Sequence, residues 1–75
     1  MVYYITRHVD TEGGLFTAVV CAVPQDQGAL AIVHTHDCDS RDGAISLLDA
    51  LARAIESELG RRGDVVLAVE RATAA

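Results

Sequence analysis

The sequence contains no tryptophan, no lysine and only three aromatic residues. Proteins that bind single-stranded nucleic acid stack bases on aromatic side chains, so this shortage argues against that class. Six arginines stand against eleven acidic residues, which gives a net charge of −5. This charge opposes contact with phosphates, so we expect no direct binding to duplex nucleic acid. A protein partner, and a basic one in particular, fits the charge better.

Long apolar runs and a secretion signal are also missing. The longest apolar run, from Leu15 to Pro24, is about half of the roughly 20 residues that a membrane helix needs. The segment MVYYITRHVD lacks the basic-then-apolar order of a signal peptide. We therefore expect a cytoplasmic protein with no membrane contact and with reduced cysteines. The sequence shows no cofactor-binding motif, so no cofactor is expected.

The chain does have a high aliphatic content, with 51% hydrophobic residues in a length of 75. This length predicts a single domain over residues 1–75. A chain this short buries only about 60–65% of the surface that its unfolded form exposes. The margin of stability is therefore small, and contact with a partner or with a second copy would add to it.

Three strands are predicted in the first half of the chain. Residues 2–9 are rich in β-branched and aromatic side chains and lead to Gly13 and Gly14, which suit a hairpin loop. Residues 15–23 predict a second strand that ends at a turn from Pro24 to Gly28. Residues 29–36 predict a third strand. The three should form an antiparallel meander.

The hydrophobic period changes after residue 41. Apolar side chains then recur at spacings of three and four, which is typical of an amphipathic helix. These residues are Ala44, Leu48, Leu51, Ile55 and Leu59. We predict a helix over residues 41–59, with Asp39 or Ser40 as the N-cap and Gly60 at the C-terminal end. Residues 65–70 predict a fourth strand.

The element order βββαβ predicts an α+β fold. A helix that returns from the third strand brings the fourth strand parallel to strands one and three. We expect the sheet order 3-2-1-4, with the helix packed on one sheet face. Ionisable side chains should then gather at one end of the sheet. They are His8, Asp10, His34, His36, Asp42 and Glu70.

One helix cannot cover both faces of a four-stranded sheet, and the second strand is apolar on both faces. An uncovered apolar face is typical of an interface. The predicted register has Asp10 opposite Leu15 and Val23 opposite Gly28. It places the following residues on the uncovered face: Tyr4, Val19, Cys21, Leu30, Ile32 and His34. We expect the protein to form a homodimer through this face, and we also expect it to bind a protein partner. A solvated face with scattered exposed aliphatic side chains is the alternative.

The segment HTHDCD, residues 34–39, contains side chains that ligate metals. His34 and His36 are two residues apart on a strand, about 6.5–7 Å at the backbone, and can converge on zinc. Asp10 is the third candidate ligand, although it is expected two strands away, about 9.5 Å across the sheet. Partly exposed histidines at the polar end of a strand, or histidines that make an interface sensitive to pH, are the alternatives.

The two cysteines are expected to be free thiols, because the predicted register places Cys21 and Cys38 far apart along the sheet. Cys21 should be a small side chain of the core or of an interface. Cys38 lies between Asp37 and Asp39, and two neighbouring negative charges disfavour the thiolate form. This environment is a poor one for a nucleophile.

The acids Asp10, Asp42 and Glu70 fall on the first strand, the start of the helix and the fourth strand. This arrangement resembles the start of the RNase H-like fold, which has the same order of elements and carries metal-binding acids at comparable places. The resemblance implies two-metal phosphoryl chemistry at these three acids. It supports an alternative function, a metal-dependent hydrolase or nuclease-like domain that uses the His and Asp cluster.

A second resemblance is carried by the segments MVYYI, GGLFTAVV and DSRDGAISLLDAL. Their order resembles that of the N-terminal domain of HicB-like antitoxins over roughly the first 59 residues. That domain is a partial double-stranded-RNA-binding fold, with a three-stranded sheet and one helix. The resemblance implies a protein that binds and blocks a basic toxin.

The helix also carries acids on its outward side, namely Asp49, Glu56 and Glu58. They could mimic nucleic-acid phosphates for a basic partner, as small phage-encoded inhibitors often do. A solvated helix face with a pair between Asp49 and Arg53 is the alternative. From the sequence we predict a small acidic interaction module, a stoichiometric inhibitor or antitoxin-like binder of a basic or nucleic-acid-handling protein. The sequence favours this binding role over an enzymatic one, because no step of turnover is visible in it.

Overall fold

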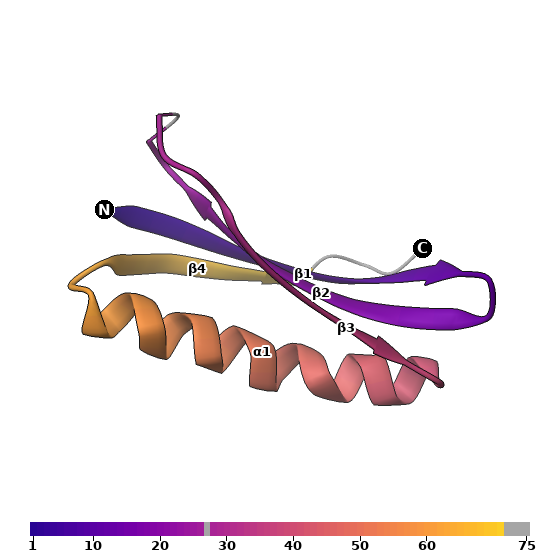
Figure 1. Cartoon of the computed structure of the whole chain (residues 1–75). Helices are drawn as coiled ribbons and strands as arrows, with labels where there is room; N and C mark the ends of the chain where they lie inside the picture. The colour runs from indigo at the N-terminus through magenta and orange to yellow at the C-terminus, as the bar shows by residue number, and fades with distance from the viewer. Residues whose placement is uncertain (27, 72–75) are drawn as a thin grey trace.

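The computed structural model describes residues 1–26 and 28–71, with side chains described up to Leu67. These residues form an α+β fold, with four strands and one helix in the order βββαβ. The elements are β1 (Val2–Glu12), β2 (Leu15–Pro24), β3 (Ile32–Cys38), α1 (Arg41–Arg61) and β4 (Val65–Arg71). The sheet order is β3-β2-β1-β4, which confirms the predicted topology, and α1 lies along one face of the sheet (Figure 1).

A long antiparallel hairpin joins β1 to β2. Its loop is formed by Gly13 and Gly14, whose φ angles of 58° and 83° are unfavourable for residues with a Cβ atom. Glu12 pairs with Leu15, so β1 extends further than the predicted residues 2–9. The ladder is shifted by two residues from the predicted register. Because side chains alternate with a period of two, this shift leaves the side chains of both strands on their predicted faces.

Helix α1 begins where a side-chain cap is available. Ser40 has an extended backbone, and its hydroxyl oxygen accepts a hydrogen bond from the Gly43 N–H at 3.0 Å. This bond satisfies one of the free donors of the first helical turn. Asp42 in the first turn and Arg61 in the last complement the helix dipole. Of the two predicted caps, Ser40 is therefore the one used.

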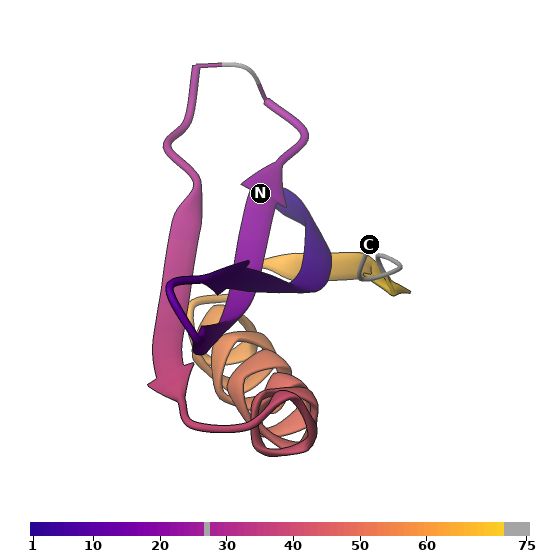
Figure 2. The ribbon, with the colours of Figure 1, turned by 90° about the vertical axis from the view of Figure 1, so that its right-hand side faces the viewer.

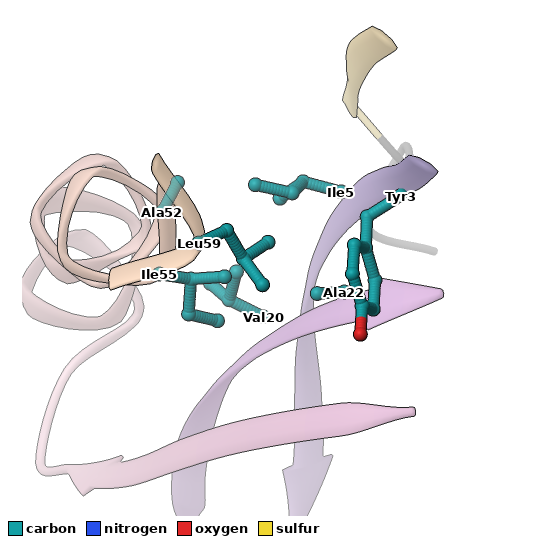
Figure 3. Close-up of a cluster of buried hydrophobic side chains, with 7 residues drawn as sticks. All are labelled: Tyr3, Ile5, Val20, Ala22, Ala52, Ile55 and Leu59. Atoms are coloured by element: carbon teal, nitrogen blue, oxygen red, sulfur yellow. The ribbon is translucent and has the colours of Figure 1, made fainter. Parts of the chain in front are cut away.

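The core lies between α1 and the helix-covered face of the sheet. Its main cluster joins three helix residues to two residues each of β1 and β2 (Figure 3). The members are Tyr3, Ile5, Val20, Ala22, Ala52, Ile55 and Leu59. A second cluster, near the start of the helix, consists of Val9, Ala18 and Ala44. Small side chains on the sheet and on the helix let the two layers approach closely.

The predicted register between β2 and β3 is wrong. Val20 pairs with His34 and Ala22 with Ile32, whereas the prediction placed Val23 opposite Gly28. The connection is longer than a tight turn, because β3 begins only at Ile32. The shift is three residues, an odd number, so every β3 side chain moves to the other face of the sheet.

The connection between β2 and β3 extends away from the rest of the molecule (Figures 1 and 2). Leu30 lies in this connection and is 88% exposed. Residues 29–31 are therefore not part of the third strand, contrary to the predicted range of 29–36. Near the start of this connection, the Asp26 carboxylate accepts a hydrogen bond from the Gly28 N–H at 3.0 Å. This bond stabilises a turn of the main chain.

Candidate protein-interaction face

We call the sheet face that α1 leaves uncovered the open face (Figure 1). Its members follow from the strand pairing, because cross-strand partners share a face and neighbours along a strand alternate. The open face of β1 to β3 comprises Val2, Tyr4, Thr6, His8, Asp10, Glu12, Leu15, Thr17, Val19, Cys21, Val23, Val33, Thr35 and Asp37.

One end of the open face is apolar. Cys21 pairs with Thr6 and with Val33, and Tyr4 pairs with Val23 in the next row. Val33 is 56% exposed and Val23 is 39% exposed, while Tyr4 and Cys21 are half-buried. When a partner covers exposed aliphatic side chains, their removal from water stabilises the complex by about 25 cal/mol for each Å² of apolar surface buried.

The other end of the open face is acidic. Thr17 of β2 pairs with Asp10 of β1 on one side and with Asp37 of β3 on the other. Glu12 is the next residue of β1 on the same face. The Thr17 hydroxyl donates a hydrogen bond to Asp37 Oδ1 at 2.7 Å, and His8 Nε2 lies 3.3 Å from Asp10 Oδ1. No arginine occupies an open-face position of β1, β2 or β3. The formal charge that β1, β2 and β3 place on this face is therefore negative.

The structure confirms the face of only half of the predicted interface residues. Tyr4 and Val19 lie on the open face, as does Cys21. Ile32 instead packs against the main core cluster, and His34 shares the helix-covered face because it pairs with buried Val20. Leu30, the sixth, lies in the connection before β3. The odd shift of the β2–β3 register explains the corrections at Ile32 and His34, whereas Leu30 is displaced because β3 begins only at Ile32.

The predicted metal ligands are not brought together either. His34 and His36 are on the helix-covered face, because their partners Val20 and Ala18 are buried there. Asp10 pairs with Thr17 and lies on the open face. Within the described residues, no group of three or more His, Cys, Asp and Glu side chains is placed to hold a metal ion. The predicted site of His34, His36 and Asp10 is therefore wrong.

The three acids on which the resemblance to the RNase H-like fold rests, Asp10, Asp42 and Glu70, do not lie together at one site either. Asp10 lies on the open face of β1, and Asp42 lies in the first turn of α1, on the opposite side of the sheet. In the ladder between β1 and β4, Glu70 stands opposite Thr6, four positions before Asp10. The side chain of Glu70 is outside the described residues.

Both cysteines are free, as predicted. Cys21 lies on the open face, whereas Cys38 pairs with Phe16 and packs against the second core cluster on the helix-covered face. The sheet itself separates the two sulfur atoms, so they cannot form a disulfide within one chain. Cys21 is the only one of the two available to a partner on the open face.

The three helix acids do not form one acidic face. Asp49 and Glu56 are seven residues apart and therefore share one flank of α1, but Glu58 is nine residues from Asp49 and lies half a turn around the helix. The Asp49 carboxylate accepts from the guanidinium of Arg7, not from the predicted partner Arg53. This pair neutralises one of the acids that were predicted to bind a basic partner.

Sequence reasoning missed Arg7. It lies on the helix-covered face between Ile5 and Val9, and its side chain is only 13% exposed. Its terminal nitrogen reaches Asp49 at the edge of the helix, but within the described residues its buried Nε has no hydrogen-bond partner. The aliphatic stem packs while the charge reaches the surface, as arginine side chains can do.

We expect Arg7→Met to leave the free energy of unfolding unchanged or to raise it by about 1 kcal/mol, because it removes a desolvated cation and an unpaired donor. Asp49→Ala should lower it by about 1 kcal/mol, since it leaves Arg7 without its partner; the exposure of Asp49 limits the loss. Urea unfolding followed by circular dichroism measures both. Arg53→Ala, at an exposed helix position, is the control. A loss above about 2 kcal/mol in Arg7→Met would show that the ion pair contributes net stability.

Comparison with known proteins adds no relative. No protein-family model, no curated protein and no solved structure matches the chain. The resemblances to HicB-like antitoxins and to the RNase H-like fold therefore stay predictions. Among the described residues, α1 is not apolar enough to cross a membrane.

Proposed function

We propose that the protein is a stoichiometric binding module, an inhibitor or antitoxin-like binder whose open face docks on a basic protein. The observation that carries this proposal is the open face itself, which joins an exposed apolar end to an acidic end. A partner that fits it has an apolar patch bordered by Arg or Lys side chains. Binding would cover that basic surface and block its contact with other anions, including nucleic acid.

An interface of standard size takes about 800 Å² from each partner. The two ends of the open face would contribute to such an interface in different ways. The apolar end supplies desolvation, and the acidic end supplies attraction over a distance and orientation.

The charge on the face favours a basic partner over a second copy. Asp10, Glu12 and Asp37 all lie at one end, and two copies aligned in the same direction would bring these acids together. The basic side chains of a partner protein would pair with these three acids whatever the direction in which the two proteins align. A homodimer through this face remains an outcome that the experiment must distinguish.

The test uses Cys21 as a reporter on the open face. In a Cys38→Ser background, Cys21 is labelled with a photoreactive maleimide, mixed with an extract of the source cells and irradiated in the presence of a chelator. We expect one discrete adduct whose partner, identified by mass spectrometry, is a basic protein. The purified partner should bind the unlabelled chain at one to one by calorimetry, more weakly at higher salt.

Two variants make the test specific. Val19→Glu places a charge next to Cys21 on the open face, at a position that is not buried, and should abolish the adduct. A label at Ser57→Cys, on the exposed side of α1, should give none. Equal capture from position 57, or an acidic partner, would contradict the proposal. An adduct of about twice 8.0 kDa, made of two copies, would show instead that a second copy covers the face.

A further inference from the structure

Two metal-ligating side chains converge at the end of β3, away from the open face. His36 and Cys38 are two residues apart and share the helix-covered face, because they pair with Ala18 and Phe16. Their backbones are about 6.5–7 Å apart by strand geometry. Nevertheless, Cys38 Sγ lies 3.9 Å from His36 Nδ1. The two side chains therefore lean toward one another.

The distance between these two atoms suits a shared zinc ion. In tetrahedral sites, Zn–S is about 2.3 Å and Zn–N about 2.0–2.1 Å, so a sulfur and a nitrogen on one zinc lie about 3.6 Å apart. The observed 3.9 Å requires only a small rotation. His36 Nδ1 also lies 3.0 Å from the Asp37 carbonyl oxygen, and zinc bound at Nδ1 would replace that contact.

The pair is held on one side and open on the other. Cys38 is half-buried against the cluster of Val9, Ala18 and Ala44, which fixes its position. His36 is exposed, and β3 is an edge strand that pairs with β2 alone in the described sheet. A second molecule can therefore reach the two ligands from the free edge of β3.

We propose that His36 and Cys38 are one half of a zinc site, and that the same two residues of a second copy complete it. A structural zinc site needs four ligands, and the described part of one chain offers no cluster of three. Two copies give two thiolates and two imidazoles around one Zn²⁺. Each thiol loses its proton to solvent as its Zn–S bond forms, so the bound site carries no net charge. The site joins two copies at the edge of β3 and leaves both open faces free.

The test uses the full chain, reduced with a thiol-free reductant, with Zn²⁺ as the only added ligand. Light scattering should show the mass rising from 8.0 kDa to about twice that value. Metal analysis of the separated dimer should give one zinc per two chains. Co²⁺ in place of Zn²⁺ should give the charge-transfer absorption of a thiolate ligand.

Matched variants separate the proposed ligands from their neighbours. Cys38→Ser and His36→Gln should each weaken zinc binding by about 100-fold or more and abolish the zinc-dependent dimer. Cys21→Ser and His34→Gln should change neither. Far-UV circular dichroism checks that each variant folds. If Cys38→Ser does not fold, His36→Gln at its exposed position decides the outcome.

Three results would overturn the zinc proposal. They are one zinc per monomeric chain, zinc retained in both ligand variants, and no zinc held at micromolar concentration. None of them bears on the open face, because photocrosslinking from Cys21 is carried out with a chelator present. The two proposals therefore succeed or fail separately.

Discussion

Leu59→Ala is expected to lower the free energy of unfolding by about 2 to 5 kcal/mol. Leu59 is fully buried and packs with Ile5 and Val20 where the last turns of α1 meet the sheet (Figure 3). The truncation removes three buried carbons and leaves a cavity that a rigid sheet cannot fill. A domain of this length has a total stability of about 4 to 11 kcal/mol, so the variant loses much of its margin.

The measurement is the midpoint and slope of urea unfolding, followed by circular dichroism. Leu30→Ala is the matched control, since it makes the same chemical change at a position that is 88% exposed. It should change the free energy of unfolding by less than about 0.5 kcal/mol. Similar losses in the two variants would contradict the assignment of the core to the helix-covered face.

Ala18→Leu is expected to lower the free energy of unfolding by about 1 to 3 kcal/mol, for the opposite reason. Ala18 is fully buried on β2, with Val9 beside it and Ala44 of α1 above it. Three added carbons must push α1 away from the sheet or adopt a strained rotamer. Since Ala44 lies near the start of the helix, the displacement should also disturb the Ser40 cap.

Thermal unfolding of Ala18→Leu should therefore show a lower midpoint, together with weaker helix signal before the transition. Ala50→Leu repeats the substitution at an exposed position of α1 and should be nearly neutral. If Ala18→Leu were also neutral, the contact between helix and sheet at this point would be looser than the structure indicates.

The architecture could be predicted because each element has a strong local pattern. Period-three and period-four spacing from Ala44 to Leu59 predicts α1, and the two-residue shift in the first hairpin does not alter which side chains face the helix. The order 3-2-1-4 follows from the single helix between the third and fourth strands. These inferences depend on patterns that tolerate errors of a residue or two at the ends.

The composition of the candidate site could not be predicted to the same extent. The register of β3 depends on the length of the connection from Gln25 to Ala31, and the turn residues Asp26 and Gly28 do not determine that length. A shift by an odd number exchanged the faces of His34 and Val33. The position of Arg7 was missed because a charged residue between Ile5 and Val9 does not reveal whether its stem is buried.

The parallel pairing of β1 with β4 also has a consequence for the order of folding. Val65 lies opposite Val2, and the chain between these partners includes almost every other element. Closing so long a loop costs about 3 to 4 kcal/mol of chain entropy, whereas the hairpin of β1 and β2 closes locally. The meander and α1 should therefore assemble first, and β4 should join a nucleus that already contains the helix.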